Sequence, residues 1–188
     1  MRVITGKYKG RKLESPPGND TRPTTDKVKE AVFDMITPWL DGAVCVDLFA
    51  GTGGLGIEAL SRGAEKCVFC ERDRKTLGIV RSNIAKCGED AVKRSVLRET
   101  DYRKCLSGLR EKADVFFLDP PYGKNIVPDC LERIEALDLL NGEGIIIAEH
   151  EKFDELPERV GSLGIFRSRR YGKTMISIYS HMDEETGE

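Results

Sequence analysis

This sequence contains few of the features that assign a protein to a class at once. No apolar run is long enough to act as a secretion signal or to cross a membrane, which predicts a cytoplasmic protein without membrane contact. The formal net charge is only −2, so no overall basic excess indicates a nucleic-acid partner. No internal repeat is visible, which argues against a repeat architecture.

Residues that commonly bind metal are also sparse. The two histidines, His150 and His181, are isolated from each other and from any cysteine pair. Cys67 and Cys70 form a C-x-x-C sequence, but residues 66–71 are predicted to form a strand, in which these side chains point to opposite faces. No second C-x-x-C follows, so no metal site is expected. Reduced thiols suit a cytosolic protein.

The length of 188 residues favours one domain that is able to bury a sizeable core. The composition is 39% hydrophobic and 33% charged, which is typical of a globular protein. We expect a basic hairpin and a helix in residues 1–40, packed on a main domain in residues 41–182, and an acidic tail in residues 183–188. We expect a monomer.

Residues 44–60, with the sequence VCVDLFAGTGGLGIEAL, carry the most informative pattern. An apolar run ends in glycines, and helical spacing follows, which predicts the strand, turn and helix that open a Rossmann sheet. Gly51, Gly53 and Gly56 match G-x-G-x-x-G, which alone would also suit a dinucleotide. Asp47 precedes these glycines, and an acid there suits an ammonium group better than a pyrophosphate. The pattern D-x-F-x-G-x-G resembles the first motif of S-adenosylmethionine-dependent methyltransferases.

Strand and helix patterns alternate through the rest of the chain. Glu71 ends a predicted strand at 66–71, where an acid is placed to bind both ribose hydroxyls of a ligand. The strand at 113–119 is apolar, as a central parallel strand should be. The other segments complete an α/β doubly wound, Rossmann-like sheet of seven strands: helices at 73–87, 102–110 and 126–137, an edge strand at 92–98, a strand at 144–150, and an antiparallel pair at 163–170 and 173–180.

The tetrapeptide D-P-P-Y at 119–122 follows the apolar strand. Two prolines stiffen the backbone and remove two N–H donors. The Asp119 carboxylate and the Pro120 carbonyl are then able to accept both N–H groups of an exocyclic purine amine, which aims the nitrogen lone pair at a methyl group. Pro121 helps to hold this turn, and Tyr122 offers a face on which the base stacks. Because the attack is an in-line displacement, positioning supplies most of the rate.

Basic residues gather near both ends of the chain, in residues 1–12 and 167–173. Residues 1–14 predict a hairpin, and we expect its turn to carry Tyr8 as an exposed aromatic residue among cations. That combination suits a phosphate backbone with a base to stack on. The residues expected to contact nucleic acid are Lys7, Tyr8, Lys9, Arg11, Lys12, Arg22, Arg170 and Lys173.

Together these motifs resemble the RsmD family, the bacterial small-subunit (16S) ribosomal RNA guanine-N2 methyltransferases. The resemblance covers nearly the whole chain. It includes V-I-T-G-K-Y-K-G-R-K-L, R-P-T-T-D-K-V-K-E-A-V-F, D-L-F-A-G-T-G-G-L-G-I-E-A-L-S-R-G-A, E-R-D, D-P-P-Y and Y-G-K-T. Several of these segments occur in all D-P-P-Y enzymes, whereas R-P-T-T-D and the basic hairpin narrow the resemblance to this family.

The resemblance implies transfer of a methyl group from S-adenosyl-L-methionine, with S-adenosylhomocysteine as product and ribosomal RNA or an assembling small subunit as substrate. It assigns Asp47 to the methionyl ammonium end of the cofactor, Glu71 to the ribose and Asp101 to the adenine amine. The residues implied to bind the cofactor are Asp47, Phe49, Ala50, Gly51, Thr52, Gly53, Glu71, Arg72, Asp101 and Asp119. Those implied to hold the target base are Asp119, Pro120, Pro121 and Tyr122.

Three alternatives remain open at this point. An adenine-N6 methyltransferase acting on DNA or RNA would use D-P-P-Y equally well, although no separate DNA-reading domain is visible. An NAD-dependent oxidoreductase would use the glycine turn, but it would leave Asp47 and D-P-P-Y without a purpose. A non-catalytic RNA-binding module would have no need of an intact D-P-P-Y. Binding of S-adenosylmethionine or of NAD in calorimetry separates these classes.

Overall fold

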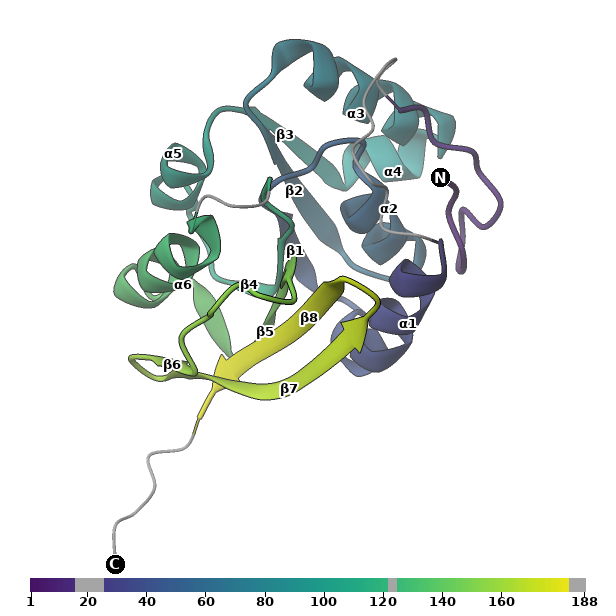
Figure 1. The fold of residues 1–188 in the computed structure, drawn as a ribbon. Coiled ribbons are helices and arrows are strands. Elements are labelled where there is room, and N and C mark those ends of the chain that lie inside the picture. The colour runs from purple at the N-terminus through teal and green to yellow at the C-terminus, as the bar shows by residue number, and fades with distance from the viewer. Residues whose placement is uncertain (16–25, 122–124, 183–188) are drawn as a thin grey trace, which may run out of the picture.

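The structure is a computed structural model that describes residues 1–15, 26–121 and 125–182. It contains one eight-stranded sheet in the order β3-β2-β1-β4-β5-β8-β7-β6, with helices on both faces (Figure 1). The chain is therefore the α/β doubly wound protein that the alternating patterns predict.

The strands in the first part of the sheet are parallel, and β1 lies in the centre between β2 and β4. Central strands of this kind are buried on both faces, which explains their nearly continuous apolar sequences. The parallel strands are β1 (Val44–Asp47), β2 (Lys66–Glu71), β3 (Ser95–Glu99), β4 (Ala113–Leu118) and β5 (Leu140–Glu151).

An antiparallel group closes the sheet beyond β5. It consists of β8 (Thr174–His181), β7 (Leu163–Tyr171) and β6 (Arg159–Val160). The predicted closing pair is confirmed. The sequence analysis missed β6, which makes eight strands rather than seven in the described part of the chain, because two residues are too few to show alternation.

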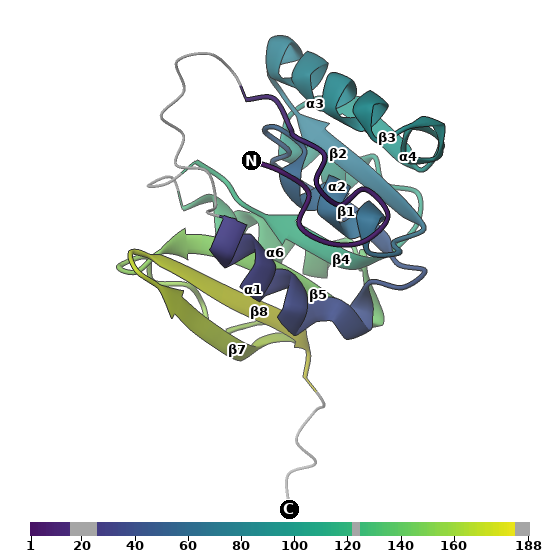
Figure 2. The same ribbon diagram turned by 90° about the vertical axis from the view of Figure 1, so that its right-hand side faces the viewer.

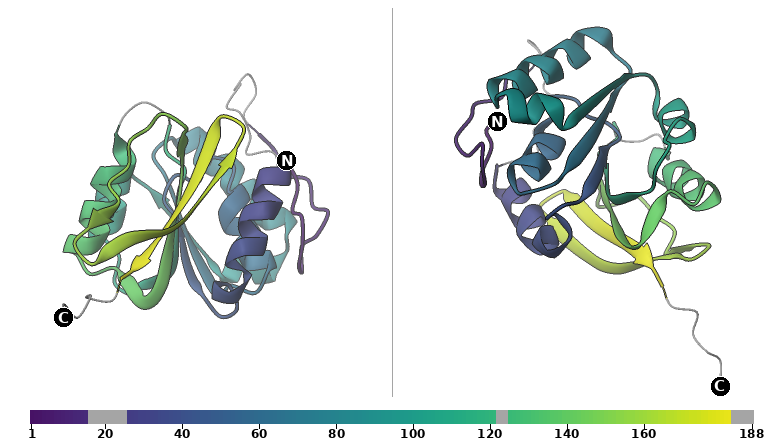
Figure 3. Two further views of the ribbon diagram at one scale, coloured as in Figure 1. Left: turned by 60° about the horizontal axis from the view of Figure 1, so that its bottom comes forward. Right: turned by 180° about the vertical axis from the view of Figure 1, so that it is seen from behind.

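The helices form two layers, one on each face of the sheet (Figure 2 and Figure 3). One face is covered by α1 (Asp26–Ile36), α2 (Gly54–Ser61), α3 (Arg74–Lys86) and α4 (Glu89–Lys93). The other face is covered by α5 (Tyr102–Ser107) and α6 (Ile126–Ala136), and a 3₁₀ turn, η1 (Thr37–Trp39), follows α1. Cys67 and Cys70 pack on opposite faces, as predicted, and all six cysteines are buried with free thiols.

The third strand is shorter than predicted. Residues 89–93 form α4 instead, with Ala91 buried and Val92 half exposed, and β3 begins only at Ser95. The prediction was wrong there because one turn of helix with a single buried position leaves no helical periodicity to recognise. The predicted position of this strand at the sheet edge is confirmed.

The N-terminal segment forms a short antiparallel turn around a single bridge between Arg2 and Lys12. The fully buried Glu58 carboxylate of α2 accepts hydrogen bonds from the Ile4 and Thr5 N–H groups at 2.8 and 3.0 Å. The ammonium group of Lys29, from α1, lies 3.3 Å from the same carboxylate. One buried acid therefore ties the N-terminal turn and α1 to α2.

Candidate methyltransferase site

Acidic side chains lie at the carboxyl ends of the parallel strands, along one edge of the sheet. Asp47 ends β1, Glu71 ends β2, Asp119 follows β4, and Glu149 stands near the end of β5. Ligands of open α/β sheets bind at this edge. A cluster of carboxylates there favours a ligand that carries positive charge.

The glycine turn joins β1 to α2 and requires glycine for two different reasons. Gly53 is the residue before the first turn of α2 and has a φ of +80°, which a residue with a Cβ adopts only with strain. Gly56 lies against β2, and a Cβ there would approach the Phe69 ring to 2.3 Å. The turn therefore holds the start of α2 close to the sheet, with its N–H groups at the carboxyl edge.

Asp47 lies under this turn and is 1% exposed. Its Oδ2 atom accepts a hydrogen bond from the Gly56 N–H at 3.0 Å. Burial raises the pKa of Asp47 to about 7, and the nearby Glu71 carboxylate adds to the shift. The carboxylate thus anchors α2, and its contact with a ligand ammonium group stays a prediction.

Glu71 is half-buried and stabilises the glycine turn from the neighbouring strand. Its Oε2 atom accepts from the Gly51 N–H at 3.2 Å, and its Oε1 atom accepts from the Asp73 N–H at 2.9 Å. Arg72, which lies between Glu71 and Asp73 in the chain, is exposed. The structure thus places Glu71 beside the predicted cofactor loop; its role toward a ribose remains untested.

Phe49, which follows β1, and Asp101, which precedes α5, lie at the same edge of the sheet. The Phe49 ring packs on Tyr102 with centroids 5.4 Å apart, and Ala50 beside it is buried. Asp101 precedes Tyr102 and caps α5, where its Oδ1 atom accepts from the Arg103 N–H at 2.9 Å. The proposed contact of Asp101 with an adenine amine stays a prediction.

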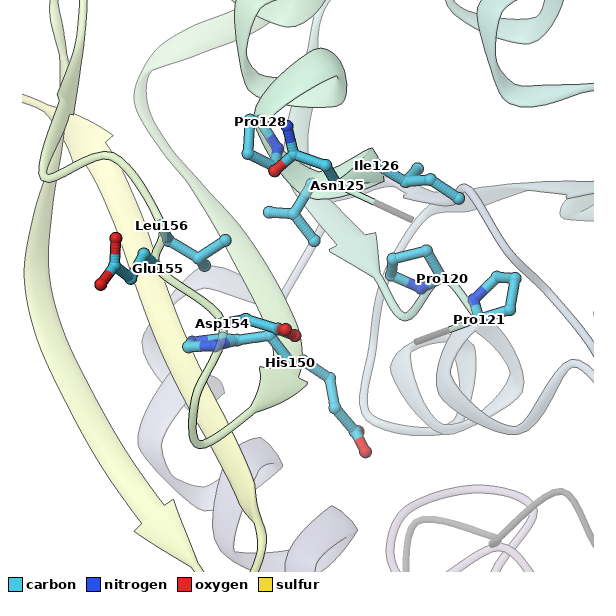
Figure 4. Close-up of a pocket in the computed structure, with 11 residues that line it drawn as sticks. Pro120, Pro121, Asn125, Ile126, Pro128, His150, Asp154, Glu155 and Leu156 are labelled. Carbon is cyan, nitrogen blue, oxygen red and sulfur yellow. The ribbon is translucent and has the colours of Figure 1, made fainter. Parts of the chain in front are cut away.

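A cavity of about 220 Å³ lies beside the proline turn that follows β4. Figure 4 shows Pro120 and Pro121 on one side of it and His150 and Leu156 across from them, with Ile126 nearby. Apolar walls with a few polar groups are typical of a small-molecule or base pocket. Tyr122 lies outside the described residues.

Asp119 is half-buried next to this cavity. Burial raises the pKa of Asp119 well above its usual range, and the carboxylates of Glu149 and Asp47 raise it further.

One prediction about the basic hairpin is wrong. Tyr8 is only 4% exposed, because its ring packs into the core and its hydroxyl donates to Asp90 at 2.6 Å and accepts from Arg94. Burial and the Asp90 hydrogen bond raise the pKa of Tyr8 to about 12. The ring holds the hairpin on the domain and is not available for stacking in this conformation.

The predicted RNA-contacting basic residues that the structure describes are exposed. Lys7 also forms an ion pair with Asp90 at 2.9 Å. Arg22 lies outside the described residues. The others are Lys9, Arg11 and Lys12 in the N-terminal turn and Arg170 and Lys173 at the turn between β7 and β8.

Asn83 was not identified from the sequence, although it connects the hairpin to the glycine turn. Its buried amide group donates to the Thr52 carbonyl at 2.9 Å and to the Glu14 carbonyl at 3.0 Å, and accepts from the Glu14 N–H at 2.8 Å. An asparagine next to the apolar stripe of α3 was the available signal. Glu149 was missed too, and its signal was an acid at the end of the apolar strand GIIIAE.

Among residues 1–15, 26–121 and 125–182, no group of three or more His, Cys, Asp or Glu side chains could hold a metal ion. No helix within those ranges is long and apolar enough to span a membrane.

Comparison with known proteins identifies the class. A solved structure titled "Putative methyltransferase yhhF from Escherichia coli" superposes with a TM-score of 0.84 at 30% identity, covering 98% of this chain and 99% of that one. The fold is thus that of a Rossmann-like methyltransferase. The model of the family "Conserved hypothetical protein 95" matches residues 1–180. The chain belongs to this family, which is the RsmD family that its motifs resemble.

Two curated relatives extend the match over nearly the full length. The protein "Putative rRNA methyltransferase YlbH" of Bacillus subtilis is 45% identical over 95% of this chain and 98% of that protein. The "Ribosomal RNA small subunit methyltransferase D" of Escherichia coli is 32% identical over 100% of this chain and 92% of that protein.

Proposed function

We propose that this protein transfers a methyl group from S-adenosyl-L-methionine to the N2 amine of a guanine in small-subunit (16S) ribosomal RNA, in the cytoplasm. The observation that carries the proposal is the Asp119-Pro120-Pro121 turn, which lies beside a base-sized cavity and at the same sheet edge as the glycine turn. The names of the curated relatives support ribosomal RNA as the substrate.

The residues at the sheet edge suit this cofactor. S-adenosylmethionine carries a sulfonium and an ammonium charge, and the carboxyl groups of Asp47, Glu71 and Asp119 lie at the same sheet edge as the glycine turn, which supports this cofactor. When bound, the cofactor supplies an electrophilic methyl group on its sulfonium sulfur. Glu71 and the turn at Gly51 would hold the cofactor beside the cavity.

The chain contributes to the reaction by orienting the base. The Asp119 carboxyl and the Pro120 carbonyl accept the two N–H groups of the exocyclic amine, and the nitrogen lone pair points along the line of attack. In the transfer, the amine nitrogen would gain the methyl group as that group leaves the cofactor's sulfur, and the nitrogen would become positively charged. Asp119 stabilises that charge, and one N–H proton then leaves to solvent.

The product nucleoside tests the proposal. The protein is incubated with unmodified small-subunit ribosomal RNA, or with its assembly particles, and methyl-labelled S-adenosylmethionine, and the RNA is digested to nucleosides. We expect the label in N2-methylguanosine. Label in N6-methyladenosine would make the adenine enzyme the correct interpretation, and calorimetric binding of NAD instead of S-adenosylmethionine would rule out both.

A further inference from the structure

Strand β7, near the open end of the sheet, carries exposed cations and an exposed aromatic side chain. We propose that β7 is a binding surface for single-stranded RNA, on which Arg167 and Arg169 contact phosphates and Phe166 stacks on an unpaired base. The inference rests on the proposed function, because it concerns how the same RNA is held while its guanine is methylated.

The charge of this part of the chain differs from that of the whole. Residues 159–173 contain five cations and no acid, whereas the full chain has a formal net charge of −2. The five cations are Arg159, Arg167, Arg169, Arg170 and Lys173. Within the described ranges, Arg167 and Arg169 take part in no ion pair, so their charges are available to a ligand.

The outer edge of β7 is open over most of its length. Strand β6 pairs only with Leu163 and Gly164, and no other strand of the described residues lies against that edge. An open edge can pair with a strand of another protein, and charged side chains on an edge strand protect against such pairing. The arginines of β7 therefore favour RNA over a protein strand as the partner of this edge.

The register of β7 against β8 places both arginines on one face of the sheet. Arg167 pairs with Ile178, and Arg169 pairs with Ile176. Directly paired residues of antiparallel strands point to the same face, and both isoleucines belong to the core cluster that also contains α1 and the N-terminal turn. Figure 2 shows α1 between the N-terminal segment and the β7–β8 pair. The two basic surfaces thus flank α1 on one face of the sheet.

Strand β7 also leads toward the candidate site. It runs parallel to β5, with β8 between them, so its carboxyl end lies at the sheet edge that carries the acidic residues. Arg169 pairs with Ile176, which in turn pairs with Glu149 of β5. Two strand spacings, about 10 Å, therefore separate Arg169 from a residue that lines the cavity.

Phe166 offers an aromatic surface next to the arginines. A bulge in the register falls between Ile165 and Arg167, and Phe166 at this bulge is 39% exposed. Its ring packs on Trp39, just after α1, with centroids 6.1 Å apart, so the ring lies on the same face as the arginines. Aromatic side chains beside cations are typical of surfaces that bind single-stranded RNA.

The double variant Arg167→Gln/Arg169→Gln tests the phosphate contacts. A fragment of small-subunit ribosomal RNA that the protein methylates is titrated at several salt concentrations. We expect RNA affinity to fall about tenfold or more and the log–log salt slope to decrease by about 1.4, which is about 0.7 for each lost contact with a single strand. A wild-type slope in this variant would overturn the inference.

Two controls accompany this variant. Arg167→Lys/Arg169→Lys keeps both charges and should keep the wild-type slope. Lys93→Gln/Arg110→Gln removes two exposed cations that precede β3 and β4, at the sheet edge opposite the site, and it should also keep the wild-type slope. A slope reduced as much in this second control would overturn the inference, because any exposed cation would then have the same effect.

The fluorescence of Trp39, the single tryptophan of the chain, tests whether RNA covers this surface. We expect bound RNA to reduce quenching of Trp39 by acrylamide, and Phe166→Ala to weaken RNA binding at least about fivefold without a change of salt slope. Unchanged quenching in the RNA complex would overturn the inference.

The outcomes separate the inference from the function on which it rests. If the wild-type protein makes no N2-methylguanosine in any small-subunit RNA or particle, the proposed function is wrong. If it makes N2-methylguanosine and the glutamine variant binds RNA as the wild type does, only the role of β7 is wrong. If that variant binds naked RNA normally but no longer binds assembly particles, β7 contacts a protein, and the inference is likewise overturned.

Discussion

The Glu71 carboxylate accepts a hydrogen bond from the Gly51 N–H at 3.2 Å, which joins the end of β2 to the glycine turn that follows β1. A second bond, from the Asp73 N–H at 2.9 Å, fixes the other carboxylate oxygen. Glu71 is therefore oriented by the backbone before any ligand arrives, and this preorganisation lowers the entropic cost of binding.

Glu71→Ala should weaken binding of S-adenosylmethionine about tenfold or more, because it removes both the proposed contact with the cofactor and the hydrogen bond that orients the glycine turn. Isothermal calorimetry measures the effect. Glu99→Ala is the matched control, since Glu99 is the register partner of Glu71 on the exposed edge strand β3, and it should leave the affinity unchanged. Equal affinities in the two variants would contradict the assignment of Glu71.

Asp119→Ala should keep cofactor affinity and lose methyl transfer by on the order of 100-fold or more, because the proposed role of Asp119 is to orient the amine and to stabilise its developing charge. Asp119→Asn should lose less, since its amide retains a carbonyl acceptor in place of the carboxyl oxygen. Single-turnover rates together with calorimetry separate the two effects. Methyl transfer by Asp119→Ala at the wild-type rate would show that the turn does not position the base.

The pH dependence of stability should show the titration of Asp47. Its pKa is raised to about 7, so the folded state holds this proton more tightly than the unfolded state does, and the free energy of unfolding falls as pH rises from about 4 to about 7. One pKa unit corresponds to about 1.4 kcal/mol. Asp47→Asn lacks this titration, so its stability should gain at least about 1.4 kcal/mol relative to wild type across that range.

Urea unfolding at a series of pH values measures this difference. Asp41→Asn, at an exposed turn position before β1, is the control and should follow the wild-type profile. If the free energies of unfolding of Asp47→Asn and wild type differed by the same amount at every pH from about 4 to about 7, the pKa of Asp47 would not be raised by folding.

Lys29→Ala should destabilise the protein by about 3 kcal/mol or more, because it leaves the buried Glu58 carboxylate without one of its cationic partners. Lys112→Ala removes an exposed cation that pairs with Asp138 at 2.6 Å, and it should cost at most about 1 kcal/mol. Denaturant unfolding compares them. Similar losses of stability in both variants would mean that the buried Lys29–Glu58 ion pair contributes no more to stability than an exposed pair does.

Neutralising Lys9, Arg11 and Lys12 together should weaken RNA binding and flatten its salt dependence by about 0.7–0.9 log–log slope units per lost phosphate contact. Lys7 is left in place because it pairs with Asp90. The control neutralises Lys66 and Lys112, which lie at the amino ends of β2 and β4, opposite the site. An unchanged salt dependence of RNA binding in the triple variant would show that the N-terminal turn does not contact RNA.

Local sequence determined much of this protein. The apolar runs, the glycines and the prolines at 120 and 121 act through burial and backbone geometry within a few residues. The alternation of strands and helices along the chain, the glycine turn and the proline turn were therefore predictable. The pattern at 89–99 failed for the same reason, since α4 is too short to leave a periodic signal.

Only the tertiary structure decided which side chains meet. Tyr8 looked like an exposed aromatic residue among cations, yet its hydroxyl reaches Asp90 and Arg94, which come from a distant helix and its end. The closeness of Asp119 to Glu149, which raises the pKa of Asp119, likewise follows from the register that pairs Leu118 of β4 with Ala148 of β5. Such contacts depend on how strands and helices pack across long separations in the chain, and the free energy of that packing is not contained in any one segment.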